Sequence, residues 1–418
     1  MEWISMRTFI EQMRTRGLVT DVHDPVSSRY DAPKRAFSTD RLLFFHNLDG
    51  RKAVMNLVAT RESLAVALGV APEILVPRLA SCRYDGKLLD AGSLFLGPVN
   101  LDEIPIMENY PGEAGRYLNS GVVFSRYEGV ENASVHRMLK AGKDRLVARL
   151  VEGRHTHTLH KKALANGERL PVAIVIGMHP LVLFASCSRV PESMELPFAA
   201  ELLGGEMPVY TLSNGVRVPD AEIILEGYIG NETAVEGPYV DITRTYDPER
   251  VQPVIELTGM YTKPDFIYHG LVNAGDEHKL LMGAPYEPLI YRSVAGVTGV
   301  TDVVLTKGGC GYLHGVVQIK KRTEGDGKNA IMAAFAAHTS LKHVVIVDGD
   351  INPGNPSDVE FAIATRVRAD RDTLIIPGVR GSSLDPSRIG DGLNVKMGID
   401  ATMELGKEEE FVRAVWED

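Results

Sequence analysis

Two carboxylates in the middle of the chain are placed where they could move a proton. Glu236 is followed by Gly237 and Pro238, which restrict the backbone, and Asp241 comes five residues after Glu236 in an apolar and aromatic run. A general acid needs such a stiff mount, because proton transfer requires its carboxyl group within hydrogen-bond reach of the reacting atom. The alternative is that both are solvated loop acids without a chemical role.

An arginine could complete this pair. If Arg137 lies between the two carboxylates, it would keep one of them ionised and bind a substrate carboxylate through two hydrogen bonds. Burial could meanwhile raise the pKa of the other carboxylate enough for it to hold a proton. The sequence alone does not show that these residues meet in space.

A second group of polar residues suits a metal ion. Asn132, His155 and Glu195 offer an amide oxygen, an imidazole nitrogen and a carboxylate, a mixed set that favours manganese or magnesium over zinc. The spacings are long, so the alternative that His155 and His157 are two histidines on one strand face stays open. Small polar residues at 185–191 close an apolar strand, where backbone groups could approach a cofactor or ion, or form an ordinary strand end.

Polar residues near the C-terminus allow two interpretations each. Asp348 and Asp350 could be a metal pair, but no further ligand is near in sequence, so an acidic turn before a helix capped by Ser357 is favoured. Lys396 could bind a phosphate, although the sequence alone favours a surface charge.

The apolar pattern predicts three segments that must position these residues. Residues 1–100 read as a small α/β domain that opens with an amphipathic helix over residues 1–17. Residues 101–300 are rich in short strands, typical of a barrel-like sheet, and residues 301–418 alternate strands and helices as an α/β domain does. The expected barrel strands are 122–127, 170–178, 181–188, 222–229, after which a polar loop interrupts the strand, and 254–262.

Composition limits the function classes. The formal net charge of −10 over 418 residues disfavours a nucleic-acid surface, and no apolar run approaches the length of a membrane span. The N-terminus lacks the continuous apolar core of a signal peptide. Three cysteines lie far apart, without a disulfide framework or zinc spacing. We therefore expect a cytoplasmic protein that binds neither nucleic acid nor membrane.

The order of these motifs resembles that of the UbiD family of prenylated-flavin decarboxylases. The resemblance rests on Asn132-x-Ser134-x-x-Arg137, His155, Glu195 and Glu236-Gly-Pro with Asp241, followed by the C-terminal runs VIVDGDI, AIATRV, SSLDPS and KMGIDAT. The leading run VATRESLAVALGV matches as well, so the resemblance covers nearly the whole chain. It implies a mixed α+β and α/β fold: a flavin-reductase-like split β-barrel with a small N-terminal α/β segment and a C-terminal α/β oligomerisation domain.

The resemblance also implies cofactors and site residues. Prenylated FMN would bind with Mn²⁺ and K⁺, and the catalytic triad would be Glu236, Arg137 and Asp241. Aspartate stands third where better-known members carry glutamate, and the chain is shorter than theirs. The implied manganese ligands are Asn132, His155 and Glu195, and the implied potassium ligands are Ala185, Ser186 and Glu195. The implied cofactor site is Asn132, Ser134, Arg137, Arg154, His155, Ser186, Cys187, Glu195 and Lys396.

The implied reaction is a non-oxidative, reversible decarboxylation of an α,β-unsaturated acid. Arg137 would orient the carboxylate, Glu236 would protonate the carbon left behind, and Asp241 would hold Arg137. With its compact length and this tail, the chain resembles the family's enzyme of the archaeal mevalonate route, which converts trans-anhydromevalonate 5-phosphate to isopentenyl phosphate and carbon dioxide. The resemblance makes that acid the first candidate.

Two alternatives remain. One is an aromatic acid such as a 4-hydroxybenzoate derivative. The other is a non-catalytic flavin- or metal-binding protein, against which the intact triad argues. The family further implies a flavin prenyltransferase as the supplier of the cofactor, and a homo-oligomer, either a dimer or a trimer of dimers.

Overall fold

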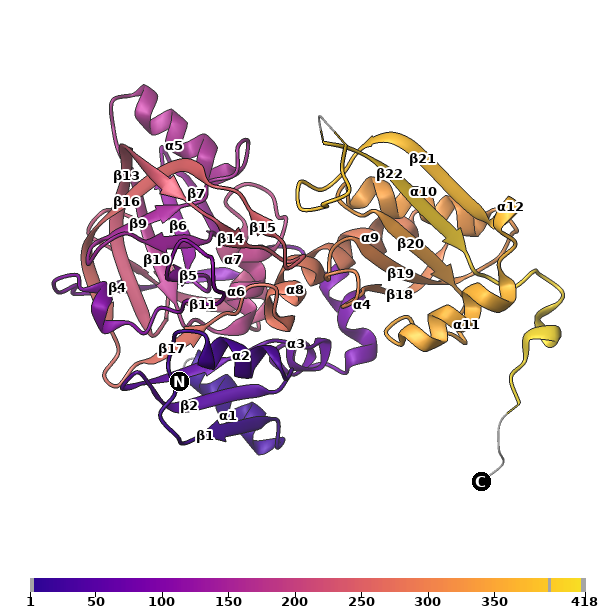
Figure 1. The fold of residues 1–418 in the computed structure, drawn as a ribbon, viewed down its shortest axis with the longest axis horizontal. Coiled ribbons are helices and arrows are strands. Elements are labelled where there is room, and N and C mark those ends of the chain that lie inside the picture. The colour runs from indigo at the N-terminus through magenta and orange to yellow at the C-terminus, as the bar shows by residue number, and fades with distance from the viewer. Residues whose placement is uncertain (1–3, 390–391, 415–418) are drawn as a thin grey trace. The chain divides into compact units, whose positions relative to one another are not determined.

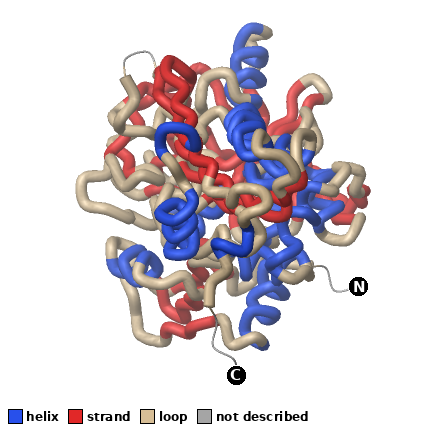
Figure 2. Tube along the Cα trace, turned by 90° about the vertical axis from the view of Figure 1, so that its right-hand side faces the viewer, coloured by secondary structure: helices blue, strands red, loops and turns tan. Residues whose placement is uncertain are grey.

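The computed structural model describes residues 4–389 and 392–414, so the first three residues of the expected N-terminal helix lie outside the described residues. The chain divides into two compact units. The first comprises the chain up to Pro72 together with Cys82–Leu281, and the second comprises Glu73–Ser81 together with the chain from Met282 onward. Helices and strands are mixed in both (Figures 1 and 2). The domain boundaries expected near residues 100 and 300 stay predictions.

An eight-stranded sheet forms the centre of the first unit. Its strands follow the order β5-β8-β9-β16-β13-β10-β6-β7, and every neighbouring pair is antiparallel. The curled sheet confirms the barrel-like fold expected from the short strands (Figure 1). The strands are β5 Tyr117–Leu118, β6 Val122–Tyr127, β7 Val130–Val135, β8 Met138–Lys140, β9 Arg145–Ala148, β10 Leu170–Ile176, β13 Ile223–Glu236 and β16 Arg250–Thr262.

Strand β13 is longer than the sequence predicts. The expected interruption after Ile229 is wrong, because β13 pairs with β16 as far as the partners Glu236 and Arg250. The polar residues at 230–232 are accommodated by a register shift between Ile229 and Thr233, which lets extra residues bulge while the pairing resumes beyond them. Because the pairing resumes after the shift, β13 extends to Glu236, and Gly237–Pro238 follow directly after the strand.

The expected strand at 181–188 is instead the helix α6, Pro180–Cys187. Proline is favoured in the first turn of a helix, where its missing N–H costs nothing, and the His179 side chain caps the start by accepting a hydrogen bond from the Leu181 N–H. Seven of the eight helical residues are buried. A helix buried on all sides has no apolar stripe, so its sequence cannot be distinguished by periodicity from that of a buried strand.

The N-terminal segment joins the same unit through a four-stranded sheet, ordered β1-β2-β3-β17. Strand β17 comes from far along the chain, after the β13–β16 hairpin, and pairs in parallel with β3. Arg7 also binds the buried Glu222 with both arms of its guanidinium, at 2.8 and 2.7 Å. The elements are α1 Met6–Thr15, β1 Val19–Val22, α2 Asp31–Phe37, β2 Leu42–Leu48, β3 Arg51–Met55, α3 Arg61–Leu68 and β17 Ile267–Gly270.

Smaller elements complete the first unit. Three strands form a separate sheet in the order β12-β11-β4, and two short strands, β14 and β15, form a hairpin beside the end of β13. The last helix, α8, runs across the boundary between the units. The elements are β4 Lys87–Ser93, α5 His155–Ala165, α7 Glu195–Leu202, β11 Glu206–Thr211, β12 Arg217–Pro219, β14 Tyr239–Val240, β15 Tyr246–Asp247 and α8 Asp276–Gly283.

The second unit is a five-stranded sheet with helices, ordered β18-β19-β20-β22-β21, as the strand-helix alternation predicts. Its buried strands are apolar, and β19, β20 and β22 run parallel. The elements are α4 Leu75–Ala80, α9 Glu287–Ala295, β18 Gly299–Leu305, β19 His314–Lys320, α10 Asp326–Ala337, β20 His343–Val347, α11 Pro356–Arg366, α12 Ala369–Asp372, β21 Thr373–Arg380 and β22 Leu393–Asp400.

The acidic turn after β20 has a structural role in this unit. The Arg366 guanidinium binds Asp348 at 3.1 Å and Asp350 at 2.6 Å, so both carboxylates have a cationic partner. Helix α11 is capped by Asn355, whose side-chain oxygen accepts a hydrogen bond from the Ser357 N–H, and the expectation of a Ser357 cap is wrong. Pro356 occupies the first position of the helix, where proline is favoured, so the extended residue before it, Asn355, is the cap.

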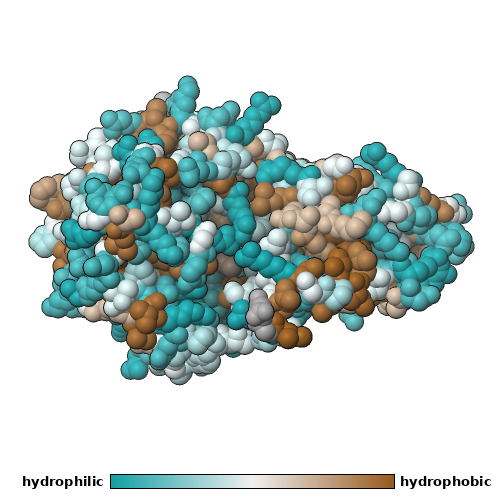
Figure 3. Space-filling model, turned by 90° about the horizontal axis from the view of Figure 1, so that it is seen from above, coloured by the Kyte–Doolittle hydropathy of each residue, from teal (hydrophilic) through white to brown (hydrophobic). Residues whose placement is uncertain are grey.

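Within the described residues, no single helix is long and apolar enough to cross a membrane, although the bent pair Arg61–Leu68 and Pro72–Ala80 together reaches that length and composition. Figure 3 shows polar side chains over much of the face seen there, with apolar side chains exposed in groups between them.

Candidate active site

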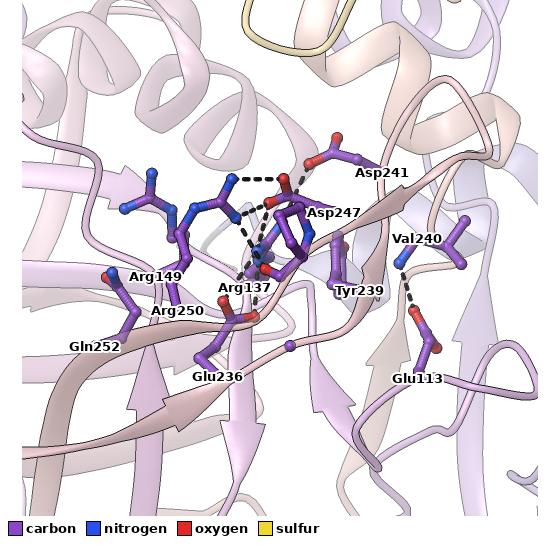
Figure 4. A network of polar contacts seen from close by, with 12 residues as sticks. Glu113, Arg137, Arg149, Glu236, Tyr239, Val240, Asp241, Asp247, Arg250 and Gln252 are labelled. Carbon is purple, nitrogen blue, oxygen red and sulfur yellow. Dashed lines mark hydrogen bonds and ion pairs between the residues drawn. The ribbon is translucent and has the colours of Figure 1, made fainter. Parts of the chain in front are cut away.

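The structure brings Arg137, Glu236 and Asp241 together (Figure 4). Arg137 binds Glu236 in a two-armed fork, with Nε to Oε1 and Nη2 to Oε2 both at 2.9 Å, and its Nη1 donates to Asp241 Oδ2 at 3.3 Å. Arg137 lies just after β7, Glu236 ends β13 and Asp241 follows β14. The long β13 strand and the β14–β15 hairpin therefore mount two carboxylates on either side of one guanidinium.

A third carboxylate, which the sequence did not single out, completes this group. Asp247 accepts a hydrogen bond from Arg137 Nη2 at 2.8 Å and binds Arg250 as well. Burial raises the pKa of Asp247, but the hydrogen bonds and charges of Arg250 and Arg137 outweigh this and hold it below the usual range. The missed signal is the β14–β15 turn, which returns the chain and places Asp247 opposite Tyr239.

Burial makes these ion pairs strong. Glu236 is completely buried and the Arg137 side chain is 9% exposed. Burial by itself lowers the pKa of Arg137, yet the hydrogen bonds and charge of Glu236 reverse this effect and raise it. Removal of one partner would leave an uncompensated buried charge, which is far more costly than the loss of an exposed pair.

Two tyrosines contact Arg137 and Glu236. The Tyr117 hydroxyl donates to Glu236 Oε1 at 3.0 Å and accepts a hydrogen bond from the Gly237 N–H at 3.1 Å. The guanidinium of Arg137 lies 4.3 Å from the ring centre of Tyr239, which packs edge-on against Tyr117. Burial raises the pKa of both phenols, so Tyr117 stays protonated and serves as a donor.

The structure also brings Asn132, His155 and Glu195 together, from β7, α5 and α7. His155 Nδ1 lies 3.2 Å from Asn132 Oδ1 and 3.9 Å from Glu195 Oε1. Two oxygen or nitrogen ligands at right angles around one divalent cation are about 3 Å apart, so these separations fit a shared ion. His155 begins a helix, and the alternative of two histidines on a strand face is wrong.

Charge at this second group also fits a cation. Burial raises the pKa of Glu195 to about 7, and repulsion from Glu131 and Glu192 adds to the effect. A divalent ion would reverse that penalty, because it stabilises the carboxylate form. Among the described residues no cluster of three or more histidine, cysteine or acidic side chains is arranged for a metal, so this set depends on the Asn132 amide oxygen.

A hydrogen-bond network fixes the Asn132 amide. Its Nδ2 donates to Ser134 Oγ and Thr156 Oγ1, both at 3.0 Å, which turns Oδ1 toward His155. His136 donates from Nδ1 to the Arg149 carbonyl at 2.9 Å, so its Nε2 accepts from the hydroxyl groups. Burial lowers the pKa of His136 and keeps it neutral. Thr156 was missed, and His136, which lies in the Asn132–Arg137 motif, was given no role, although the alternation of 132, 134 and 136 indicates that the three share one face.

The remaining candidates at the end of α6 face their own helix. Ser186 Oγ donates to the Val182 carbonyl at 2.9 Å, and the Ala185 carbonyl accepts from the Ser188 N–H at 3.0 Å. Burial raises the pKa of Cys187 to about 12, so it is a neutral thiol. Helix α6 packs against β7 and α7, which carry the metal candidates Asn132 and Glu195. Arg154 is exposed and directly precedes α5, where its side chain makes no capping hydrogen bond.

Lys396 lies in the second unit, on β22, and is 5% exposed. Its Nζ donates to the carbonyls of Thr339 and Leu341 and lies 5.0 Å from the ring centre of Phe335. Burial lowers the pKa of its ammonium group to about 8. The interpretation of Lys396 as a surface charge is therefore wrong.

Three successive domains of one family match this chain. They are the N-terminal domain, the Rift-related domain and the C-terminal domain of 3-octaprenyl-4-hydroxybenzoate carboxy-lyase, which match residues 10–82, 94–276 and 279–401. The chain belongs to the UbiD family, as the motif order predicts. It is thus a carboxy-lyase, an enzyme class that removes or adds carbon dioxide.

Relatives and solved structures agree over nearly the whole length. The chain is 51% identical to anhydromevalonate phosphate decarboxylase of Methanosarcina mazei, covering 99% of both chains, and 48% identical to that of Archaeoglobus fulgidus, covering 87% of this chain and 85% of the relative. The UbiD-class enzyme HmfF of Pelotomaculum thermopropionicum in complex with FMN matches with a TM-score of 0.92 at 33% identity, covering 99% and 97%. An evolved dimeric form of HmfF with prFMN matches with a TM-score of 0.88 at 31% identity, with the same coverage.

Proposed function

We propose that this enzyme decarboxylates trans-anhydromevalonate 5-phosphate to isopentenyl phosphate and carbon dioxide. Identity of 51% over 99% of a decarboxylase of anhydromevalonate phosphate supports this substrate. The observation that carries the proposal is the buried fork between Arg137 and Glu236, flanked by Asp241, because it provides both a carboxylate-binding cation and a proton carrier in one water-poor site.

Arg137 orients the substrate carboxylate. Its longest contact is that of Nη1 with Asp241, at 3.3 Å, while its other hydrogen bonds are 2.8–2.9 Å. A substrate carboxylate therefore loses the least hydrogen-bond energy when it replaces Asp241 at Nη1. Glu236 and Asp247 both accept from Nη2 and keep the guanidinium in place while Nη1 exchanges its partner, which limits the rotation of the side chain.

Glu236 delivers the proton. When carbon dioxide leaves, the carbon that carried it needs a proton, and Glu236 is the carboxyl group fixed by Arg137 and Tyr117. Complete burial excludes water as a competing donor. Three hydrogen bonds from Arg137 and Tyr117 fix the position of this carboxyl group.

Prenylated FMN, when bound, supplies the acceptor for the electron pair released with carbon dioxide, which no protein side chain can provide. The residues of the first unit that would hold it are Asn132, Ser134, Arg137, Arg154, His155, Ser186, Cys187 and Glu195. Mn²⁺ would be bound by Asn132, His155 and Glu195, whose spacing fits one cation, and K⁺ by Ala185, Ser186 and Glu195. The HmfF complexes with FMN and prFMN support the flavin in this set.

We further propose a homo-oligomer, a dimer or trimer of dimers, and a flavin prenyltransferase that supplies the cofactor. An edge strand supports self-association, because β21 ends the second sheet and leaves backbone groups unpaired. Large apolar side chains are exposed on and beside it, with Ile375 at 62%, Leu393 at 48% and Val395 at 43%. The dimeric form of HmfF shows that a protein of this fold assembles with itself.

The experiment uses protein reconstituted with prenylated FMN and Mn²⁺, supplied with trans-anhydromevalonate 5-phosphate. Release of carbon dioxide and isopentenyl phosphate is measured for the wild type and for Glu236→Gln. Turnover by the wild type but not by Glu236→Gln supports both the proposed substrate and Glu236 as the proton donor. Turnover of 4-hydroxybenzoate derivatives alone would move the substrate to the aromatic acids, and no turnover of any acid with full cofactor loading would favour a binding protein.

A further inference from the structure

Two cations beside the catalytic group share one aromatic ring. The guanidinium carbon of Arg244 lies 4.6 Å from the ring centre of Phe37, and the ammonium nitrogen of Lys279 lies 6.0 Å from the same centre. Within the part of the chain that the structure describes, neither cation takes part in an ion pair with a carboxylate. Two like charges near one ring concentrate positive charge locally, which attracts an anion.

The pair borders the catalytic group. Arg244 lies in the turn after Asp241, whose carbonyl accepts the Arg244 N–H at 2.8 Å. Lys279 directly follows His278 on α8, and the charges of Asp241 and Arg137 both act on the His278 imidazole. The two cations therefore approach the same Asp241 from different segments of the first unit.

One neutral donor, His278, and one tyrosine accompany the cations. His278 accepts the Ala274 N–H at Nδ1, at 3.0 Å, so in its neutral form the proton is on Nε2. Burial lowers the pKa of His278, although the charge of Asp241 opposes this shift. The lowered pKa keeps the imidazole neutral. Tyr110 donates to the Asn273 carbonyl at 3.0 Å and lies beside Arg244; burial raises its pKa to about 12.

Two cations with a neighbouring N–H donor are the chemistry that recognises a phosphate monoester, which carries nearly two negative charges near neutral pH. An acid with a five-carbon chain and a phosphate on its last carbon separates carboxylate and phosphate by roughly 7 Å when extended, from bonds of about 1.5 Å. With the carboxylate on Arg137, the phosphate must therefore meet residues that border the Arg137 group.

We propose that Arg244 and Lys279 bind the phosphate of the substrate, with His278 as an accompanying donor. This inference rests on the proposed function, because it assigns the phosphate end of that substrate. The phosphate of the flavin has the same chemistry, so the test must separate the two sources.

The test compares Arg244→Gln, Lys279→Gln and their double variant with wild type. Arg145→Gln is the matched control, since Arg145 is an arginine of the same unit whose partner is the surface residue Glu232. Kinetics are measured with trans-anhydromevalonate 5-phosphate and with the same acid lacking the phosphate. Binding of isopentenyl phosphate to cofactor-free protein is measured by calorimetry, and flavin loading by absorbance.

Each single variant is expected to raise KM for the phosphorylated acid by about 10- to 100-fold, as the loss of one charged hydrogen bond does. Binding of isopentenyl phosphate should weaken by a similar factor. The values of kcat, the kinetics with the unphosphorylated acid, the flavin loading and the Arg145→Gln control should stay within about threefold of wild type. Lys279→Arg should restore most of the affinity, because it restores the charge.

The outcomes are distinguishable. Unchanged KM and product binding in the double variant, with wild-type turnover of the phosphorylated acid, would overturn this inference and leave the proposed function intact. Reduced flavin loading with unchanged KM would assign the cluster to the flavin phosphate and overturn it as well. Wild-type turnover of aromatic acids only, without binding of isopentenyl phosphate, would overturn the proposed function together with the inference.

Discussion

The hydroxyl of Tyr117 joins the catalytic carboxylate to the backbone that carries it. It donates to Glu236 Oε1 at 3.0 Å and accepts the N–H of Gly237, the next residue, at 3.1 Å. One phenol thereby fixes both the side chain and the turn after β13. The orientation of Glu236 toward Arg137 depends on this link as well as on the ion pair.

Tyr117→Phe is expected to lower the free energy of unfolding by about 1–3 kcal/mol, because it leaves the buried Gly237 N–H without a partner. Urea unfolding followed by circular dichroism measures the change. Tyr246→Phe is the control, since its hydroxyl bonds the Pro111 carbonyl at an exposed site, and it should cost less than about 0.5 kcal/mol. Equal losses in both variants would contradict the role given to Tyr117.

Arg137→Lys is expected to reduce kcat/KM by at least about 100-fold although the charge is kept. A lysine ammonium is a point charge and cannot form the two-armed fork with Glu236 while also reaching Asp241 and Asp247. Steady-state kinetics with cofactor-loaded protein measures the effect. Arg169→Lys, an exposed surface pair with Glu256, should change kcat/KM by less than about twofold. A fully active Arg137→Lys variant would remove the fork from the mechanism.

Glu195→Gln is expected to abolish binding of manganese. The amide cannot supply the negative charge that completes the set with Asn132 and His155. Elemental analysis of protein purified with added Mn²⁺ measures metal content. Glu192→Gln removes a nearby exposed carboxylate and should retain the metal. Full metal content in Glu195→Gln would exclude Glu195 as a ligand.

Titration of Glu113 is expected to lower the free energy of unfolding by up to about 2 kcal/mol as the pH rises from about 4.5 to about 6. Burial raises the pKa of this carboxyl from 4.5 to about 6, although the N–H groups of Val240 and Tyr110 oppose the shift. The folded state therefore holds a proton that the unfolded state has released in this window, so folding is favoured below it. Above pH 6 the effect is constant.

Glu113→Gln should remove this contribution to the pH dependence. Unfolding by urea at several pH values, compared between wild type and variant, measures it. The difference between the two free energies of unfolding should change across the window from pH 4.5 to 6 and be flat on either side. A difference that does not vary with pH would show that Glu113 titrates normally in the folded state.

The apolar runs were enough to predict most strands and the overall fold. The strand over 122–127 appears as expected, and β10 lies within the strand expected over 170–178, because a short apolar run bounded by turn residues is a local signal. The prediction of a strand at 181–188 was wrong because complete burial removes the periodicity that distinguishes a helix from a strand.

The site was predictable in its residue types and only partly in its geometry. Arg137 and Glu236 are 99 residues apart in the chain, so no local pattern could show that they form a fork. Asp247 was missed because its role follows from the β14–β15 hairpin, which the sequence does not indicate. Burial of Lys396 was missed because a lone lysine in a strand is usually solvated, and the two carbonyls that satisfy it come from another segment.

The pairing of β17 with β3 has a consequence for the order in which the protein can be made. The residues of β3, 51–55, leave the ribosome more than two hundred residues before Ile267–Gly270, their partners on the open side of the sheet. During synthesis the nascent N-terminal segment therefore waits with an unpaired strand edge, and its sheet can close only after the whole β13–β16 hairpin has emerged.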